Sequence, residues 1–281
     1  MNLLTIASLT LREAARRRVL AAVALLTLVT IGLTAWGFAK LHGAMLLRGD
    51  QTFVLGSFAI LVLLIGYMFS VVLGIGAAFV AAPAIGSDVE SGVVLAMLPR
   101  PIRRSDFVIG KWIALVALLV GYAFVAGGIE LALVYVISGY APPHPLRALA
   151  FMSAEGVVLV TLALALGTRL PPIAAGIVAI VFFGVTWVAG VAQSIAIALH
   201  NDGVVHATTI VSLLLPTDAL WRGAAFALEP AAIAAAAMTD VTRESPFLVG
   251  APPPAAYIWW TLGWLAAVLA AAVVSFNRRD L

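Results

Sequence analysis

The sequence predicts an all-α, polytopic membrane protein with six membrane-spanning helices. Of the 281 residues, 63% are hydrophobic and 10% are charged, whereas soluble domains have about 45–50% apolar and about 25% charged residues. Spanning a bilayer core takes roughly 20 apolar helical residues, and barrel strands would be about ten residues long with alternating polarity. Six continuously apolar runs meet the helical criterion, and we place them within a single transmembrane domain 1–281, at residues 19–39, 53–80, 112–138, 148–168, 173–199 and 256–276.

The composition and motif content exclude several classes of protein. The chain has no cysteine, which excludes thiolate metal sites, catalytic thiols and disulfides. A formal net charge of +3 is too small to indicate nucleic-acid binding. The sequence contains no G-x-x-x-x-G-K-[ST], H-E-x-x-H or G-x-S-x-G motif, so neither a nucleotide site nor a hydrolase site is predicted. His200, Asp202 and His206 fit no known zinc spacing, and no metal site is predicted.

An amphipathic helix is predicted before the first span. Leucines and alanines of residues 3–15 fall on one arc of a helical wheel and polar residues fall opposite, with Leu9 as the exception. Such a helix lies along a membrane surface with its basic residues at anionic headgroups. A simple topology anchor and a docking surface for a partner both stay open as its role. The charged residues of this segment are Arg12, Glu13, Arg16, Arg17 and Arg18.

The distribution of lysine and arginine predicts the orientation. With the N-terminus in the cytoplasm, 11 of the 16 lysines and arginines fall on the inner side. The positive-inside rule therefore places both termini in the cytoplasm, with loop 81–111 on the inner side and loop 200–255 on the outer side.

A stripe of small residues marks the second span. Gly66, Ser70, Gly74 and Ala78 recur at four-residue spacing, a pattern that lets another helix approach closely. Packing within the chain and packing against a second copy are both open, and the former is favoured.

The inner loop 81–111 is predicted to contain a short helix. Pro83 is expected to end or kink the second span. Ser87 is expected to cap a helix with Asp88 and Glu90 in its first turn, where acids suit the helix dipole. We expect this helix to reach Leu98.

A second helix start is predicted later in the same loop. Pro99 and Pro101 are expected to break the short helix. Ser105 or Asp106 is expected to cap the next helix, which leads into the third span. The loop thus presents apolar residues between acidic and basic groups to the cytoplasm, although a plain solvated connection is the alternative.

Two carboxyl groups fall inside predicted spans. Glu130 lies in the third span and Glu155 in the fourth, and a carboxylate at mid-membrane costs roughly 2.5–3.5 kcal/mol on insertion scales. Both are expected at a similar depth in the outer third, on consecutive antiparallel helices. They are candidates for a translocation path, and hydrogen-bonded carboxyls at helix contacts are the alternative.

Four further segments stand in chain order: LTLREAARRRVL near the N-terminus, ESG followed by LPRPIRRSDFVIGK in loop 81–111, LPTDALWR before the last span, and FNRRDL at the end. Together they resemble type-2 ABC transporter permeases, the transmembrane subunits of ABC exporters. Val93 stands where the family usually has threonine. The similarity covers the whole chain and is strongest to the branch that contains the permease of the nitrous-oxide-reductase maturation system.

The resemblance implies an elbow helix at the N-terminus, a cytoplasmic coupling helix in loop 81–111 and an outer re-entrant helical hairpin in residues 200–255. In the family, the coupling helix docks on a separate ATPase subunit, present in two copies, which binds the ATP and magnesium. This chain would bind no cofactor. The residues implied in docking are Asp88, Glu90, Ser91, Gly92, Leu95, Met97, Pro99, Arg100, Pro101, Arg103 and Arg104.

The resemblance also implies an outer gate and a partner permease. Pro216, Asp218 and Arg222 are the candidate gate, and Asp218 and Arg222 have the i,i+4 spacing of an ion pair, which a purely structural role would explain equally well. We therefore predict a permease subunit of an ATP-driven exporter in the cytoplasmic (inner) membrane. It would pair with a second copy or a second permease and move an unidentified substrate. An ion-coupled secondary transporter using Glu130 and Glu155, and an integral membrane enzyme, are the alternatives.

Overall fold

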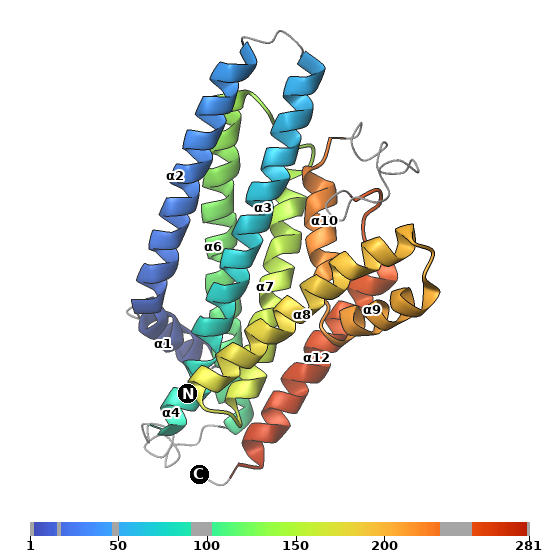
Figure 1. The fold of residues 1–281 in the computed structure, drawn as a ribbon. Helices are drawn as coiled ribbons and strands as arrows, with labels where there is room; N and C mark the ends of the chain where they lie inside the picture. The colour runs from blue at the N-terminus through green and yellow to red at the C-terminus, as the bar shows by residue number, and fades with distance from the viewer. Residues whose placement is uncertain (1–2, 16–17, 47–50, 91–102, 231–248, 280–281) are drawn as a thin grey trace.

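The computed structural model describes residues 3–15, 18–46, 51–90, 103–230 and 249–279, and every regular element in these ranges is an α-helix (Figure 1). Six helices in the described part are long and apolar enough to cross a membrane, which confirms the predicted fold class. Each predicted span lies within one of these helices or extends at most one residue past its end, and the helices themselves run up to eight residues beyond the predicted spans. These helices are α2 (Arg18–Leu46), α3 (Gln51–Ala81), α6 (Arg104–Ser138), α7 (Pro145–Gly167), α8 (Pro172–Ala198) and α12 (Ala255–Asn277).

Four shorter helices accompany the spans. They are α1 (Leu3–Ala15), α4 (Pro83–Glu90), α9 (Asp202–Leu214) and α10 (Asp218–Leu228). Helices α1 and α4 and both chain termini lie at one end of the bundle, which we call the α4 end (Figure 1). At the other end α6 finishes and α7 begins, and we call this the Tyr140 end.

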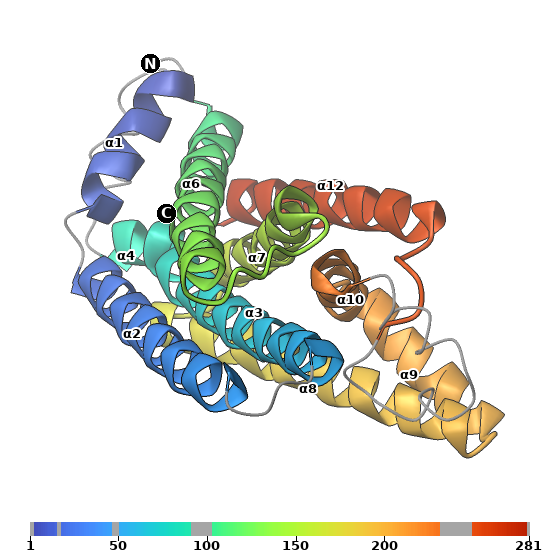
Figure 2. The ribbon, with the colours of Figure 1, turned by 90° about the horizontal axis from the view of Figure 1, so that it is seen from above.

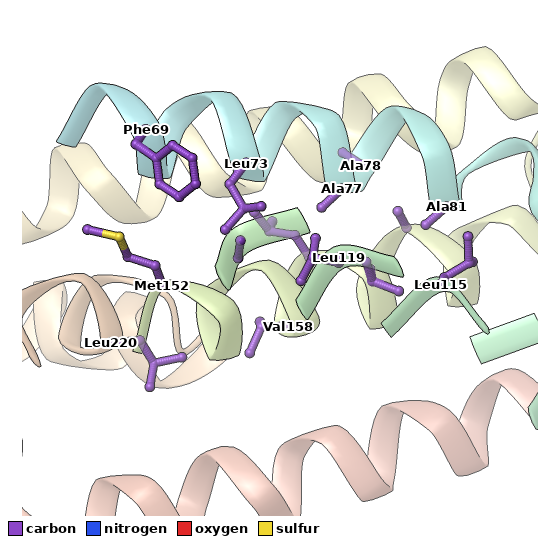
Figure 3. Packing of buried hydrophobic residues seen from close by; sticks show 14 of the residues in the cluster. Phe69, Leu73, Ala77, Ala78, Ala81, Leu115, Leu119, Met152, Val158 and Leu220 are labelled. Atoms are coloured by element: carbon purple, nitrogen blue, oxygen red, sulfur yellow. The ribbon is translucent and has the colours of Figure 1, made fainter. Parts of the chain in front are cut away.

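Helix α7 is the central helix of the bundle. It packs against α3, α6, α8, α10 and α12, and the view from above shows it surrounded by them (Figure 2). In the most apolar 18-residue stretch of α7, 61% of the residues are buried, whereas 11% are buried in the corresponding stretch of α12. Consequently α12 presents most of its apolar surface outward, as a helix in contact with lipid does. The core between α3, α6 and α7 is visible in Figure 3 and includes Phe69, Leu73, Ala77, Leu115, Leu119, Met152 and Val158.

The small-residue stripe of α3 packs within the chain. A Cβ atom added at Gly66 would lie 2.9 Å from Leu228 Cδ1, and one added at Gly74 would lie 2.9 Å from Leu159 Cδ1. Ala78 is fully buried. The stripe therefore lets α7 and α10 approach α3, as the favoured interpretation predicted.

The predicted N-terminal helix exists as a separate element. Helix α1 packs against α6 with Ile6, Ala7 and Thr10 buried. Leu9 is 49% exposed and Arg12 is exposed as well. Its position along a membrane surface stays a prediction.

The predicted helix caps of loop 81–111 are wrong. Helix α4 begins at Pro83, and Ser87 lies inside it with its hydroxyl bonded to the carbonyl of Pro83. A proline starts a helix readily, because its fixed φ suits the first turn and its missing N–H is not needed there. Helix α6 begins at Arg104, and its N-cap residue Arg103 makes no side-chain cap, because a guanidinium has no acceptor; the Asp106 N–H bonds to the Arg103 carbonyl at 3.0 Å. Neither Ser105 nor Asp106 is the cap.

Candidate functional site

A buried lysine fastens α4 to α6. The Lys111 ammonium group donates hydrogen bonds to the Asp88 carboxylate and to the Ala84 carbonyl, and it lies 5.0 Å from the centre of the Phe107 ring. Lys111 is 3% exposed, and a buried cation is stable only when it is paired and hydrogen-bonded. Helix α4 is therefore held to the first two turns of α6.

Arginines tie three helices together at the α4 end. Arg104 Nη1 donates to the carbonyls of Asn277 and Arg279 at 3.0 and 2.9 Å. Arg279 Nη1 donates to the Thr168 carbonyl at 2.7 Å, and Arg169 Nε donates to Ser275 Oγ at 2.9 Å. Because helix C-termini carry partial negative charge, cations are favourable there. The end of α12 is thus held by the start of α6 and the turn after α7.

The structure places some of the predicted docking residues and not others. Glu90 and Arg103 are exposed and flank the segment 91–102. Asp88 is bonded to Lys111 and Arg104 to the end of α12, so both have partners within the chain. Ser91, Gly92, Leu95, Met97, Pro99, Arg100 and Pro101 lie outside the described residues, as do Arg16 and Arg17 and the side chains of Glu13 and Arg18. Docking on an ATPase stays a prediction for the whole set.

A polar cluster is buried between α3, α7, α8 and α10. The Ser70 hydroxyl donates to the Glu155 carboxyl, and Glu155 is 3% exposed. The Asp218 carboxyl is close enough to Glu155 to interact with it electrostatically. Arg222 Nε donates to Asp218 Oδ2 at 2.8 Å. The cluster therefore brings two acids from different helices together, with Ser70 bonded to Glu155 and Arg222 bonded to Asp218.

The Asp218–Arg222 pair also docks α10 on α8. Arg222 Nη2 donates to the Gly190 carbonyl at 2.7 Å and to Ser194 Oγ at 3.2 Å. Asp218 is the first residue of α10, where a carboxylate complements the helix dipole. Buried Pro216 lies between α9 and α10, which meet at a bend of 94°. A broken or re-entrant element is thus present where the resemblance implied a hairpin.

Aromatic residues of α12 donate hydrogen bonds to the carbonyl groups at the end of α9. Tyr257 Oη donates to the Ser212 carbonyl at 3.1 Å, and the indole N–H groups of Trp260 and Trp264 donate to the Leu213 and Leu214 carbonyls at 3.0 and 2.8 Å. The last carbonyls of a helix have no partner within it. The tryptophans therefore allow α9 to end beside an apolar helix. Sequence reasoning missed these contacts, since tryptophan near a span end reads equally well as an interfacial anchor.

Glu130 belongs to a separate polar contact. Thr34 Oγ1 of α2 donates to Glu130 Oε1 at 3.2 Å, and Glu130 is 3% exposed. It lies eight residues before the end of α6 and Glu155 lies ten residues after the start of α7, hence about 12 and 15 Å along the helices. The two acids thus lie at similar distances along their helices from the Tyr140 end, and their shared depth in a membrane stays a prediction. Each takes its hydrogen bond from a different neighbouring helix, α2 for Glu130 and α3 for Glu155.

These features define a multi-pass helical membrane protein with a short helix packed on α6 at one end and a bent helical pair between its last two spans. The chain matches the family described as "ABC-2 family transporter protein" over residues 4–281. It belongs to this family and is a transmembrane component of an ABC transporter. A search of curated protein sequences gave no match.

Proposed function

We propose that the chain is the permease subunit of an ATP-driven exporter in the cytoplasmic membrane, with the α4 end and both termini in the cytoplasm. ATP and magnesium bind to a separate ATPase subunit present in two copies. Two permeases, either identical or paired, form the membrane part of the complex. Within the family, the sequence resemblance favours the branch of the nitrous-oxide-reductase maturation permease, and the cargo is unidentified.

The mechanical link between α4 and the spans carries this proposal. Helix α4 follows α3 after a single turn residue, Ala82, whose N–H bonds to the Ala78 carbonyl at 2.9 Å. Lys111 holds the other side of α4 to α6. A force applied to segment 91–102, which begins after exposed Glu90, would therefore reach two spans through short, hydrogen-bonded connections. An ATPase subunit docked there could move both.

The pair Asp218–Arg222 is proposed as the gate at the opposite end. It holds α10 against α8 through the Gly190 carbonyl, so opening between these helices requires that these bonds exchange. Glu155 lies beside the pair and is the proposed path residue of this region, with Glu130 the second. Their neutralisation to Gln is the test of an ion-coupled mechanism, because a carrier driven by protons or cations would lose coupling without the carboxylates.

The docking proposal is tested by charge reversal of Glu90. The Glu90→Lys variant, co-expressed with the cognate ATPase, should recover less ATPase on purification of the permease and should lose transport. Asp202→Lys is the matched control, since Asp202 is an exposed acid at the start of α9, away from the α4 end. Full ATPase recovery and full transport by the Glu90→Lys variant would show that docking occurs elsewhere. ATP binding by the isolated permease would contradict the proposal that ATP binds to the separate ATPase subunit.

A further inference from the structure

An open apolar groove runs between α2 and α6. Its volume is about 670 Å³, and its walls include Leu28 and Ile31 of α2 and Gly121 and Val125 of α6. Both helices are membrane-spanning by length and composition, so the groove opens at the depth of the hydrocarbon core. No helix of the described residues fills it.

The polar groups in the lining of the groove are already hydrogen-bonded, so the groove does not require a polar ligand. Thr27 and Tyr122 are the polar residues in its lining, and their hydroxyl groups bond to each other. The Thr27 hydroxyl also bonds to the Val23 carbonyl at 2.8 Å. Since these groups are satisfied within the chain, a saturated hydrocarbon can fill the groove without leaving a polar atom unpaired.

The groove continues inward as a smaller cavity. This cavity of about 80 Å³ shares Ala24, Leu118 and Tyr122 with the groove and reaches Gly76 of α3 and Val160 of α7. Apart from Tyr122, whose hydroxyl is bonded to Thr27, this cavity is apolar, and its small volume suits the end of a flexible chain better than a rigid ring system. The shape thus favours a long, thin, apolar ligand that enters from the bilayer.

The groove is lined at one end by the residue that precedes an exposed arginine. Leu11 of α1 forms part of its lining, and the next residue, Arg12, is exposed. Helix α1 runs between the beginnings of α2 and α6 (Figure 2). A ligand whose apolar chain lies in the groove would therefore have its polar end near α1, where Arg12 complements a negative charge.

We propose that this groove is a binding site for one acyl chain of an anionic membrane phospholipid, with the lipid phosphate at Arg12. A lipid chain gains no hydrophobic free energy by leaving other lipid chains for an apolar groove. Occupancy therefore depends on the fit of the chain to the groove and on the charge of the headgroup. One basic residue at a membrane surface favours an anionic headgroup by about fivefold, which is about 1 kcal/mol converted at 1.4 kcal/mol per tenfold.

The site is tested by photolabelling of the full chain in nanodiscs. The probe is phosphatidylglycerol with a diazirine in its acyl chain, and phosphatidylcholine with the same chain is the comparison. Labels should concentrate on residues of α2 and α6 that line the groove. Labelling by phosphatidylglycerol should exceed labelling by phosphatidylcholine by about fivefold, and Arg12→Gln should remove this difference.

Filling the groove provides the second arm of the test. A Cβ at Gly121 meets no atom within 4 Å, so Gly121→Phe can occupy the groove without a clash at its first carbon. It should lower labelling of α2 and α6 several-fold, and Gly121→Ala should lower it less. Gly263→Phe of α12, another glycine with open space at its Cβ, is the matched control and should label as the wild type does.

Three results would overturn the proposal. Labels spread evenly over all exposed helix faces would show contact with bulk lipid alone. Undiminished labelling of the groove in a folded Gly121→Phe variant would show that the chain does not lie there. A wild-type dimer that dissociates in Gly121→Phe would assign the groove to a second copy of the protein. None of these readouts involves ATP or cargo, so they stand apart from the test of the proposed function.

Discussion

The substitution Gly190→Ala is expected to separate α10 from α8. A Cβ atom at residue 190 would lie 1.9 Å from Asp218 Oδ1 and 2.4 Å from its Cγ, whereas real carbon contacts below 3.0 Å are essentially never seen. Either α10 must move away by more than an ångström, or Asp218 must leave the rotamer that binds Arg222. Both outcomes disturb the hydrogen bonds of Arg222 to the Asp218 carboxylate and to the Gly190 carbonyl.

The expected cost follows from those bonds. A hydrogen bond to a charged group contributes about 1.5–3 kcal/mol to stability. Alanine in place of glycine inside a helix raises the free energy of unfolding by about 1 kcal/mol, because alanine has the higher helix propensity. The loss of one such bond should therefore lower the free energy of unfolding by about 0.5–2 kcal/mol. Gly184 lies on the same helix, and a Cβ there meets nothing within 4 Å, so Gly184→Ala should leave stability unchanged or raise it by up to about 1 kcal/mol.

The assay is reversible unfolding in mixed micelles of increasing SDS content, followed by tryptophan fluorescence. A double-mutant cycle with Asp218→Ala isolates the clash, because removal of the carboxylate makes room for the new methyl group. The double variant should be no less stable than Asp218→Ala alone, so the two single costs should not add. Equal shifts for Gly190→Ala and Gly184→Ala, or fully additive costs in the cycle, would refute the assignment of this contact.

Three further outcomes are expected from the polar contacts. Glu155→Gln should stay within about 1 kcal/mol of wild type because its amide oxygen still accepts from Ser70, whereas Glu155→Leu should cost about 1–3 kcal/mol in the same SDS assay. Lys111→Met should speed hydrogen exchange in α4 by loosening its hold on Asp88, and exchange at the wild-type rate would mean that other contacts keep α4 in place. Burial raises the pKa of Glu229 from 4.5 to about 7, so the folded carboxyl keeps its proton to higher pH than the unfolded one. Its contribution to stability is then complete below about pH 4.5 and is lost as the pH rises to about 7; melting at pH 5 and 8 should differ less in Glu229→Gln than in wild type.

The spans could be predicted from sequence because their signal is long and redundant. A run of about twenty apolar residues can be recognised as a membrane-spanning helix without knowledge of the helices it packs against. Glu130 and Glu155 were conspicuous for the same reason, as charged residues inside such runs. Their partners could not be predicted, because many hydroxyl groups lie in the neighbouring spans. The rotation of each helix decides that Thr34 and Ser70 are the ones that meet the acids.

Local signals failed where they competed within a few residues. Ser87 was expected to start a helix and Pro83 to end or kink the second span, whereas Pro83 itself starts α4 because α4 follows α3 almost directly. From the sequence, Lys111 is one of the inner-side charges and the last residue of LPRPIRRSDFVIGK. Its burial and its bond to Asp88 depend on how α4 folds back on α6, which is a tertiary contact across 23 residues. Charge at a span end thus indicates topology and does not distinguish an exposed cation from a structural one.

Helix α7 connects the proposed docking end to the proposed gate. At its last residue, a Cβ on Gly167 would lie 2.6 Å from the carbonyl oxygen of Ala82, the residue between α3 and α4. Near its other end, Phe151 fills the space beside Gly223 of α10, where a Cβ would lie 2.8 Å from the ring. Close-packed interiors transmit displacement because they have little free volume to absorb it. A push on α4 is therefore expected to shift α7 as a rigid rod and to reach α10 directly, without bending of the spans between them.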